Sequence, residues 1–146
     1  MINLIGKVKS LYLSKPNKQR ISTNYIKVDN KGVLDDKFYD KNANRNILIT
    51  STKSYEIAKK NNIEIDYGLL GENILVDIDI SDLVTDDIIE IGDIKLKITQ
   101  NCTICKGLAQ INHNLPQLLS KDRGIFAQAI NNGTIYLNDI VRIKRK

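Results

Sequence analysis

Apolar and polar residues alternate strictly over one stretch of the chain, from Ile94 to Thr99. A period of two places successive side chains on opposite faces, so this stretch is predicted to be a strand with one buried face. Ile dominates its apolar positions, and β-branched residues favour strands. Further strands are expected at residues 2–13 with a break near Gly6, 19–28, 46–49, 74–80, 88–91 and 141–143, with a tight turn at Gly92-Asp93. The pattern therefore predicts a mainly β fold.

Helical signals are fewer than strand signals. They predict a helix capped by Ser51-Thr52 that runs to about Asn61, a single turn at 115–119, and a helix over 124–132 with Gly133 as its stop. Because helices do not separate the strands regularly, we do not expect a doubly wound parallel sheet. The order of elements favours a closed or nearly closed β-barrel with a few helices over its openings. The polar stretch 29–44 is predicted to be a long surface loop.

The length of 146 residues suits one domain, so residues 1–146 are expected to form a single domain. No apolar run reaches the roughly 18 residues that a membrane helix needs. The first residues are interrupted by Lys7 and Lys9 and lack the continuous apolar stretch of a signal peptide. We therefore expect a cytoplasmic protein without a membrane partner.

The net charge of +5 indicates an anionic partner. Nucleic-acid binding normally adds aromatic residues among the basic ones, and aromatic residues make up only 5% of this chain, with no Trp. Nucleic acid is therefore not the expected partner. A small anionic ligand, such as a phosphate-bearing cofactor, agrees with the charge equally well.

Two cysteines follow the clearest strand, at Cys102 and Cys105. They are half of a zinc site, which would need His113 and a carboxylate to be complete. They are also the spacing of a redox dithiol, although the surroundings lack the βαβ pattern of thioredoxin-like proteins. A single working thiolate, activated by Lys106, could carry a persulfide, attack a sulfur or bind a soft metal. Two buried, inert cysteines are the fourth interpretation, and the residues alone leave all four open.

Two further segments carry candidate residues. Gly71-Glu72-Asn73 precedes an alternating strand, where Gly and Asn suit an ordinary turn and Glu72 suits either that turn or a buried carboxylate that holds a loop. Arg123 precedes the expected helix at 124–132, where it could bind phosphate or simply lie at the surface. Neither a nucleophile elbow nor a glycine-rich phosphate loop is present in the sequence.

Taken in order, these segments resemble the MOSC domain, the C-terminal domain of molybdenum cofactor sulfurases. The matching stretches are Gly32 to Lys37, Arg45 to Ile49, Gly71-Glu72-Asn73-Ile74, Ile91-Gly92-Asp93, Ile98-Thr99-Gln100, Cys105 with Leu108, Arg123 to Ala127, Gly133 to Ile135 and Asn138 to Val141. The sequence departs from the family pattern at three places. Ile104 stands where Pro often precedes the cysteine, Asp35 stands where Gly is common, and Phe38 stands where His is frequent.

The resemblance implies a β-barrel of MOSC type, similar to the barrel of pyruvate kinase, and a role around molybdenum cofactor. In this family the cysteine, here Cys105, is proposed to carry sulfur as a persulfide or to bind molybdenum, and Cys102 could resolve such a persulfide. Lys37, Arg45 and Arg123 are then the candidates for the anionic pterin phosphate. Glu72 and Asn73 are expected to shape the pocket. Pyridoxal phosphate is not expected, because the desulfurase domain of the large sulfurases does not fit in this chain.

The resemblance leaves the activity open. It implies either a sulfurtransferase related to the sulfurases or a molybdenum-dependent reductase of N-hydroxylated compounds. A non-catalytic module that relays sulfur or delivers cofactor is the alternative, with a molybdoenzyme or a cysteine desulfurase as its partner. A redox protein that uses Cys102 and Cys105 as a dithiol is the third possibility.

Overall fold

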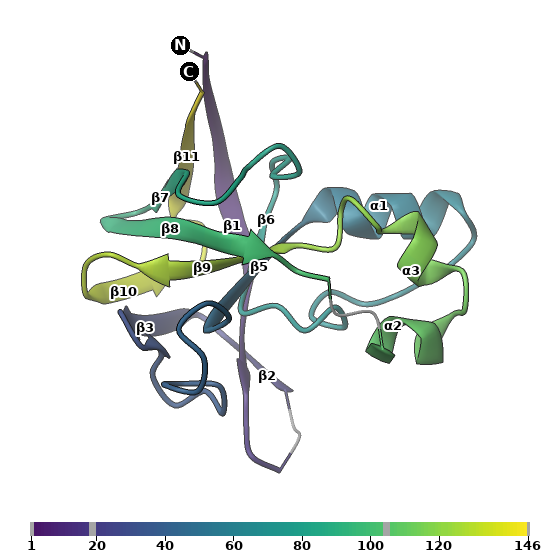
Figure 1. The fold of residues 1–146 in the computed structure, drawn as a ribbon, viewed down its shortest axis with the longest axis horizontal. Helices are drawn as coiled ribbons and strands as arrows, with labels where there is room; N and C mark the ends of the chain where they lie inside the picture. The colour runs from purple at the N-terminus through teal and green to yellow at the C-terminus, as the bar shows by residue number, and fades with distance from the viewer. Residues whose placement is uncertain (1, 18–19, 104–105, 146) are drawn as a thin grey trace.

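The computed structural model describes residues 2–17, 20–103 and 106–145. Within these ranges, seven strands close into a barrel in the order β11-β7-β8-β9-β5-β6-β1, and β1 pairs with β11 to complete the ring (Figure 1). Their bounds are β1 Ile2–Ser14, β5 Ile47–Ser51, β6 Ile74–Val76, β7 Ile88–Ile91, β8 Ile94–Asn101, β9 Ile125–Ala129 and β11 Ile140–Arg145. The predicted mainly β barrel is confirmed.

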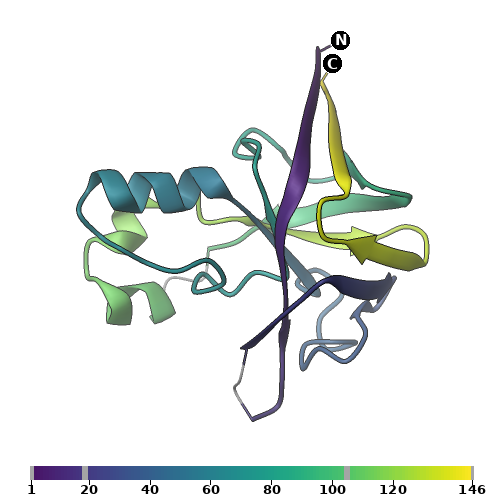
Figure 2. The same ribbon diagram turned by 180° about the vertical axis from the view of Figure 1, so that it is seen from behind.

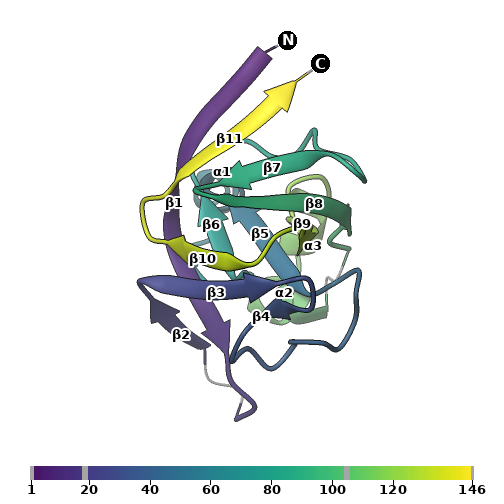
Figure 3. The same cartoon turned by 90° about the vertical axis from the view of Figure 1, so that its left-hand side faces the viewer.

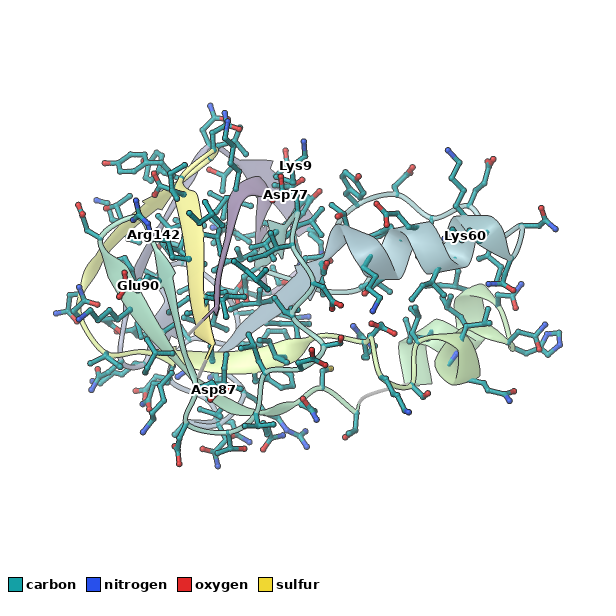
Figure 4. All side chains as sticks on the ribbon, turned by 90° about the horizontal axis from the view of Figure 1, so that it is seen from above. Lys9, Lys60, Asp77, Asp87, Glu90 and Arg142 are labelled. Atoms are coloured by element: carbon teal, nitrogen blue, oxygen red, sulfur yellow. The ribbon has the colours of Figure 1, made fainter. Side chains whose placement is uncertain are left out.

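The barrel interior is built from the alternation seen in the sequence. On β8, Ile94, Leu96 and Ile98 are buried while the lysines between them are exposed or half-buried. The predicted turn after β7 is also present, because Gly92 adopts a φ of 57° that suits glycine and lets β7 and β8 pair as antiparallel neighbours. On the outer face, Glu90 of β7 lies opposite Arg142 of β11, and Figure 4 shows both on the barrel.

β1 is the longest of these strands and pairs with three others. Its first half pairs with β11, and its second half pairs with β6 and with the short strand β2, Arg20–Thr23. With these three partners it runs along one side of the barrel (Figures 1 and 3). We predicted a break near Gly6, but the strand continues through it, and the irregularity in its pairing lies between Val8 and Ser10.

The helix predicted at 124–132 is wrong. That stretch forms β9, and Gly133, its expected stop, begins strand β10, Gly133–Tyr136. Ile125, Ala127 and Ala129 are buried in the core with period two, and β9 pairs with β5 on one side and β8 on the other. Hydrogen bonds on both edges therefore outweigh the local helical signal. β10 joins a second, three-stranded sheet with β3, Tyr25–Asp29, and β4, Gly32–Val33.

Other predicted strands are shorter than expected. The strand predicted at 19–28 is divided between β2 and β3, and that at 74–80 ends at Val76. Much of the predicted loop at 29–44 is irregular, although it contains β4. This loop lies beside the barrel and, as shown below, supplies part of a cavity.

Helices gather on one side of the barrel, as Figure 2 shows from behind. The predicted α1, Thr52–Lys60, is present, and its Ser51 cap accepts a hydrogen bond from the Lys53 amide at 3.1 Å. The single turn at 115–119 appears as α3, Leu115–Leu118, and α2, Lys106–Ile111, was not predicted. The side chains between these helices and the barrel form a second apolar cluster, which includes Tyr55 and Leu70. In the described ranges, no helix is long and apolar enough to cross a membrane.

Candidate functional site

A cavity of about 420 Å³ opens where the loop between β4 and β5 meets the segment before β6. Central strand β5 forms its base, because Ile47 and Ile49 point into the barrel core while Leu48, between them, lines the cavity. The turn before β9 closes another side through Arg123. Segments far apart in the sequence thus form one site.

Positive charge dominates this cavity. No Asp or Glu side chain is among the described residues that line it. Cationic side chains enter it from β2, from the β4–β5 loop and from the turn before β9, and they are Arg20, Lys37, Lys41, Arg45 and Arg123. Such a set attracts anions, and guanidinium groups bind phosphate or carboxylate through paired hydrogen bonds.

Arg20 is held in place by the chain itself. Its Nη1 donates a hydrogen bond to the backbone oxygen of Glu72 at 2.8 Å. The hairpin between β1 and β2 brings it there from far along the sequence, and neither Arg20 nor Lys41 was predicted as a site residue. No local motif marks either of them, because only the fold brings them to the cavity.

Apolar side chains form the rest of the wall, and one carries the described thiol. Cys102 packs against Leu48 and Phe126, is 4% exposed and is a free cysteine. Its amide donates to the Gly124 oxygen at 2.9 Å, which fixes the start of the segment that follows β8. A smaller cavity of about 40 Å³ also has Cys102 in its lining. Cys105 lies outside the described residues, so its predicted role stays a prediction.

Asn73 ties three parts of the site together. Its Oδ1 accepts from the Leu48 amide at 3.1 Å, and its Nδ2 donates to the Tyr12 oxygen at 3.3 Å and to Asp36 Oδ1 at 3.1 Å. Asp36, which was not predicted as a site residue, is itself buried and accepts from the Ser14 amide at 2.6 Å. Together these bonds fasten the β4–β5 loop to β1 and β5, so Asn73 shapes the cavity that it lines.

Glu72 lies behind the wall instead of in the cavity lining. Its side chain is fully buried, and Oε2 accepts from Thr50 Oγ1 at 2.7 Å and from Tyr55 Oη at 2.5 Å. Burial raises the pKa of the Tyr55 hydroxyl well above its ordinary range, and the neighbouring charge of Glu72 raises it further. The hydroxyl therefore remains a donor. It also accepts from the Gly68 amide at 3.0 Å, so this network holds the segment before β6.

The structure brings most of the predicted residues together. Lys37, Arg45, Asn73, Cys102 and Arg123 all line the same cavity, while Glu72 supports it from behind. No group of three or more His, Cys, Asp or Glu side chains that could hold a metal occurs within the described ranges. The chemistry of the described lining is therefore that of an anion site with an apolar wall and one buried thiol.

Comparisons with known proteins identify a family and several similar structures. The family model of the MOSC domain matches residues 35–142. A search of the curated proteins found no match. The crystal structure of the YuaD protein from Bacillus subtilis is similar, with a TM-score of 0.85 at 16% identity over 97% of this chain and 96% of that chain.

Two YiiM structures share the fold as well. The protein from Geobacillus stearothermophilus has a TM-score of 0.71 at 16% identity, over 97% of this chain and 76% of that chain. The protein from Escherichia coli has a TM-score of 0.68 at 14% identity, over 96% of this chain and 70% of that chain. At these identities the likeness shows the fold alone.

Proposed function

Because the chain belongs to the MOSC domain family, which is associated with molybdenum cofactor, we propose that its basic cavity binds that cofactor. The observation that carries this proposal is the convergence of cations from three distant segments, without a lining carboxylate, on one cavity. Such a cavity suits a ligand with a strongly anionic end. The pterin of molybdenum cofactor ends in a phosphate.

The described residues fit this ligand in size and in chemistry. A volume of about 420 Å³ lies within the range of small-ligand sites. Lys37, Arg45 and Arg123 would hold the phosphate, and Arg20 and Lys41 would add to the positive field. The apolar side chains of the wall would cover the ring system and exclude water from it. When bound, the cofactor supplies the redox chemistry of molybdenum.

A thiol is the second part of the proposal. Cys105 would act as the sulfur carrier or as a ligand to molybdenum, for which a thiolate is a suitable soft donor. Cys102, buried in the cavity wall, would then attack the inner sulfur of the Cys105 persulfide, which is the sulfur of the Cys105 side chain itself. This forms a Cys102–Cys105 disulfide, breaks the S–S bond of the persulfide and releases its outer sulfur as hydrosulfide. A free Cys102 thiol agrees with a reducing compartment, and we propose the cytoplasm as the place of action.

The test is the molybdenum and pterin content of the purified protein. It is expressed in a host that makes molybdenum cofactor and purified without oxygen, after which the metal and the fluorescent oxidised pterin are measured. Near-stoichiometric pterin is expected for the wild type, with molybdenum lost from the Cys105→Ser variant if Cys105 is a ligand. A wild-type protein that carries neither metal nor pterin contradicts cofactor binding.

The carrier role has its own readout. A sulfane-sulfur signal that disappears in the Cys105→Ser variant, without molybdenum or pterin, favours a module that relays sulfur. Its proposed partner is then a cysteine desulfurase on the donor side or a molybdoenzyme on the acceptor side. Recovery of such a partner by pull-down, with no turnover by the isolated protein, supports this second function.

A further inference from the structure

Both phenylalanines of the chain line the basic cavity. Phe126 is buried in its wall, with 6% of its surface exposed, whereas Phe38 is 48% exposed. Neighbouring positive charges do not stabilise an apolar side chain at the surface of a cavity, except where a cation contacts the face of an aromatic ring.

The backbone beneath Phe38 is held on both sides. Its amide donates to Asp36 Oδ2 at 3.0 Å, and the Lys37 amide donates to the Ser14 oxygen at 2.7 Å. One turn later, the Lys41 amide donates to the Phe38 oxygen at 3.3 Å. Because Asp36 is itself buried and bonded to Asn73, the exposed ring projects from an anchored part of the loop.

A cation lies close to this ring. The Lys37 ammonium is 5.0 Å from the ring centroid, within the range of a cation–π contact. Lys37 lines the cavity too, so an aromatic surface and a positive charge lie side by side at one wall. A ligand that uses both needs a flat ring and an anionic group within the same small molecule.

We propose that Phe38 is a specificity-determining residue that stacks on a planar heterocyclic ring, while the surrounding cations hold the anionic arm of the same ligand. This inference rests on the proposed function, because it uses the same cavity. In nucleic-acid complexes, the stacking of a heterocyclic base on an aromatic side chain strengthens binding and does so for every base, because each base has a flat π face. It would favour planar anions over anions of equal charge without a ring.

Two sources could supply this chemistry. One is the pyrimidine part of the cofactor's pterin, and the other is a heterocyclic substrate that carries a phosphate or carboxylate. Three probes separate them: 6-carboxypterin, adenosine monophosphate and inorganic pyrophosphate, which has charge but no ring. Binding to the purified full-length protein is measured by calorimetry or by pterin fluorescence.

The variants are Phe38→Leu, which keeps an apolar side chain of similar size, and Phe38→Tyr, which restores an aromatic ring. Phe38→Leu is expected to weaken the planar probe that the wild type prefers about fivefold, as for the loss of an aromatic contact. Pyrophosphate binding should stay unchanged, and Phe38→Tyr should bind like the wild type. Tighter binding of 6-carboxypterin than of adenosine monophosphate identifies the cofactor as the ligand that stacks on Phe38. The opposite preference identifies a heterocyclic substrate.

Two outcomes would overturn the inference. Planar probes that bind Phe38→Leu as tightly as they bind the wild type show that the Phe38 ring does not stack on them. An equal response of all probes to Phe38→Leu makes Phe38 a structural residue. In both cases pyrophosphate still binds, so the anion site survives. Failure of pyrophosphate to bind the wild type instead removes the anion site on which the proposed function depends.

Discussion

Removal of a single hydroxyl, in Tyr55→Phe, tests the network behind the cavity. The Tyr55 hydroxyl donates to Glu72 at 2.5 Å and accepts from the Gly68 amide at 3.0 Å and, more weakly, from the Leu70 amide at 3.4 Å. The phenylalanine side chain keeps the apolar packing of the ring. The substitution therefore isolates the hydrogen bonds from the packing.

The expected loss of stability follows from these contacts. A hydrogen bond to a charged group contributes about 1.5–3 kcal/mol, and a buried donor left without an acceptor costs about 1–3 kcal/mol. Glu72 keeps Thr50 as a donor, and the longer Leu70 contact contributes little. We predict a decrease of about 3 kcal/mol in the free energy of unfolding, which lowers the Tm by roughly 10 °C for a chain of this size.

Urea unfolding followed by circular dichroism measures this change, with Tyr25→Phe as the matched control. Tyr25 is 49% exposed, and loss of its hydroxyl should change stability by less than about 0.5 kcal/mol. The pKa of the Tyr55 hydroxyl is raised far above neutrality. The difference in unfolding free energy between the two variants should therefore be the same at every pH from about 6 to about 8. A Tyr55→Phe protein as stable as the control would refute the proposed network.

Three further predictions concern the loops around the site. Asp36→Ala removes a carboxylate that accepts hydrogen bonds from two backbone amides and from Asn73, so the β4–β5 loop should become looser. Calorimetry should then show that pyrophosphate binds about tenfold more weakly. Gly68→Ala should lower the Tm, since Gly68 has a φ of 93° and a Cβ there would lie 2.9 Å from an aromatic ring of β1; an unchanged melting curve would contradict this. Burial alone would raise the pKa of Asp79, but hydrogen bonds from Ser81 and Lys53 lower it overall. The ionised Asp79 side chain therefore stabilises the fold above the pKa that it has in the unfolded chain, and this stabilisation is lost as the pH falls through the lower pKa of the folded state. The free energy of unfolding of Asp79→Asn, measured as the pH is lowered, should lack this part of the acid-induced loss.

The strands could be predicted from the sequence where alternation is regular. Ile94 to Thr99 is the clearest case, because one face is buried in the core and the other is exposed or half-buried. The alternation of β9 was harder to recognise, since Phe126 on its outer face is also apolar and is buried in the cavity wall. Combined with Gly133, this run of apolar residues suggested a helix. This segment is a strand because it pairs with β5 and β8, which are distant in sequence.

The site could be predicted only where a residue belongs to a recognisable motif. Lys37, Arg45, Asn73 and Arg123 lie in the stretches that resemble the MOSC domain, and they line one cavity. Arg20 lies outside those stretches and reaches the cavity through the β1–β2 hairpin, a contact that no local pattern specifies. The position of Cys105 lies outside the described residues, so its chemistry remains a prediction for experiment.

The most direct test of the account is pterin retention after selective removal of charge. Lys37→Gln/Arg45→Gln removes two cations from the cavity, and Lys59→Gln/Lys60→Gln removes two exposed cations from α1, where Figure 4 marks Lys60. Both proteins have the same net charge. After expression in a host that makes molybdenum cofactor, we predict at least a tenfold loss of pterin per chain for the cavity variant and none for the α1 variant, consistent with charge-assisted phosphate contacts. Equal pterin content in the two variants would contradict the claim that this cavity binds the cofactor.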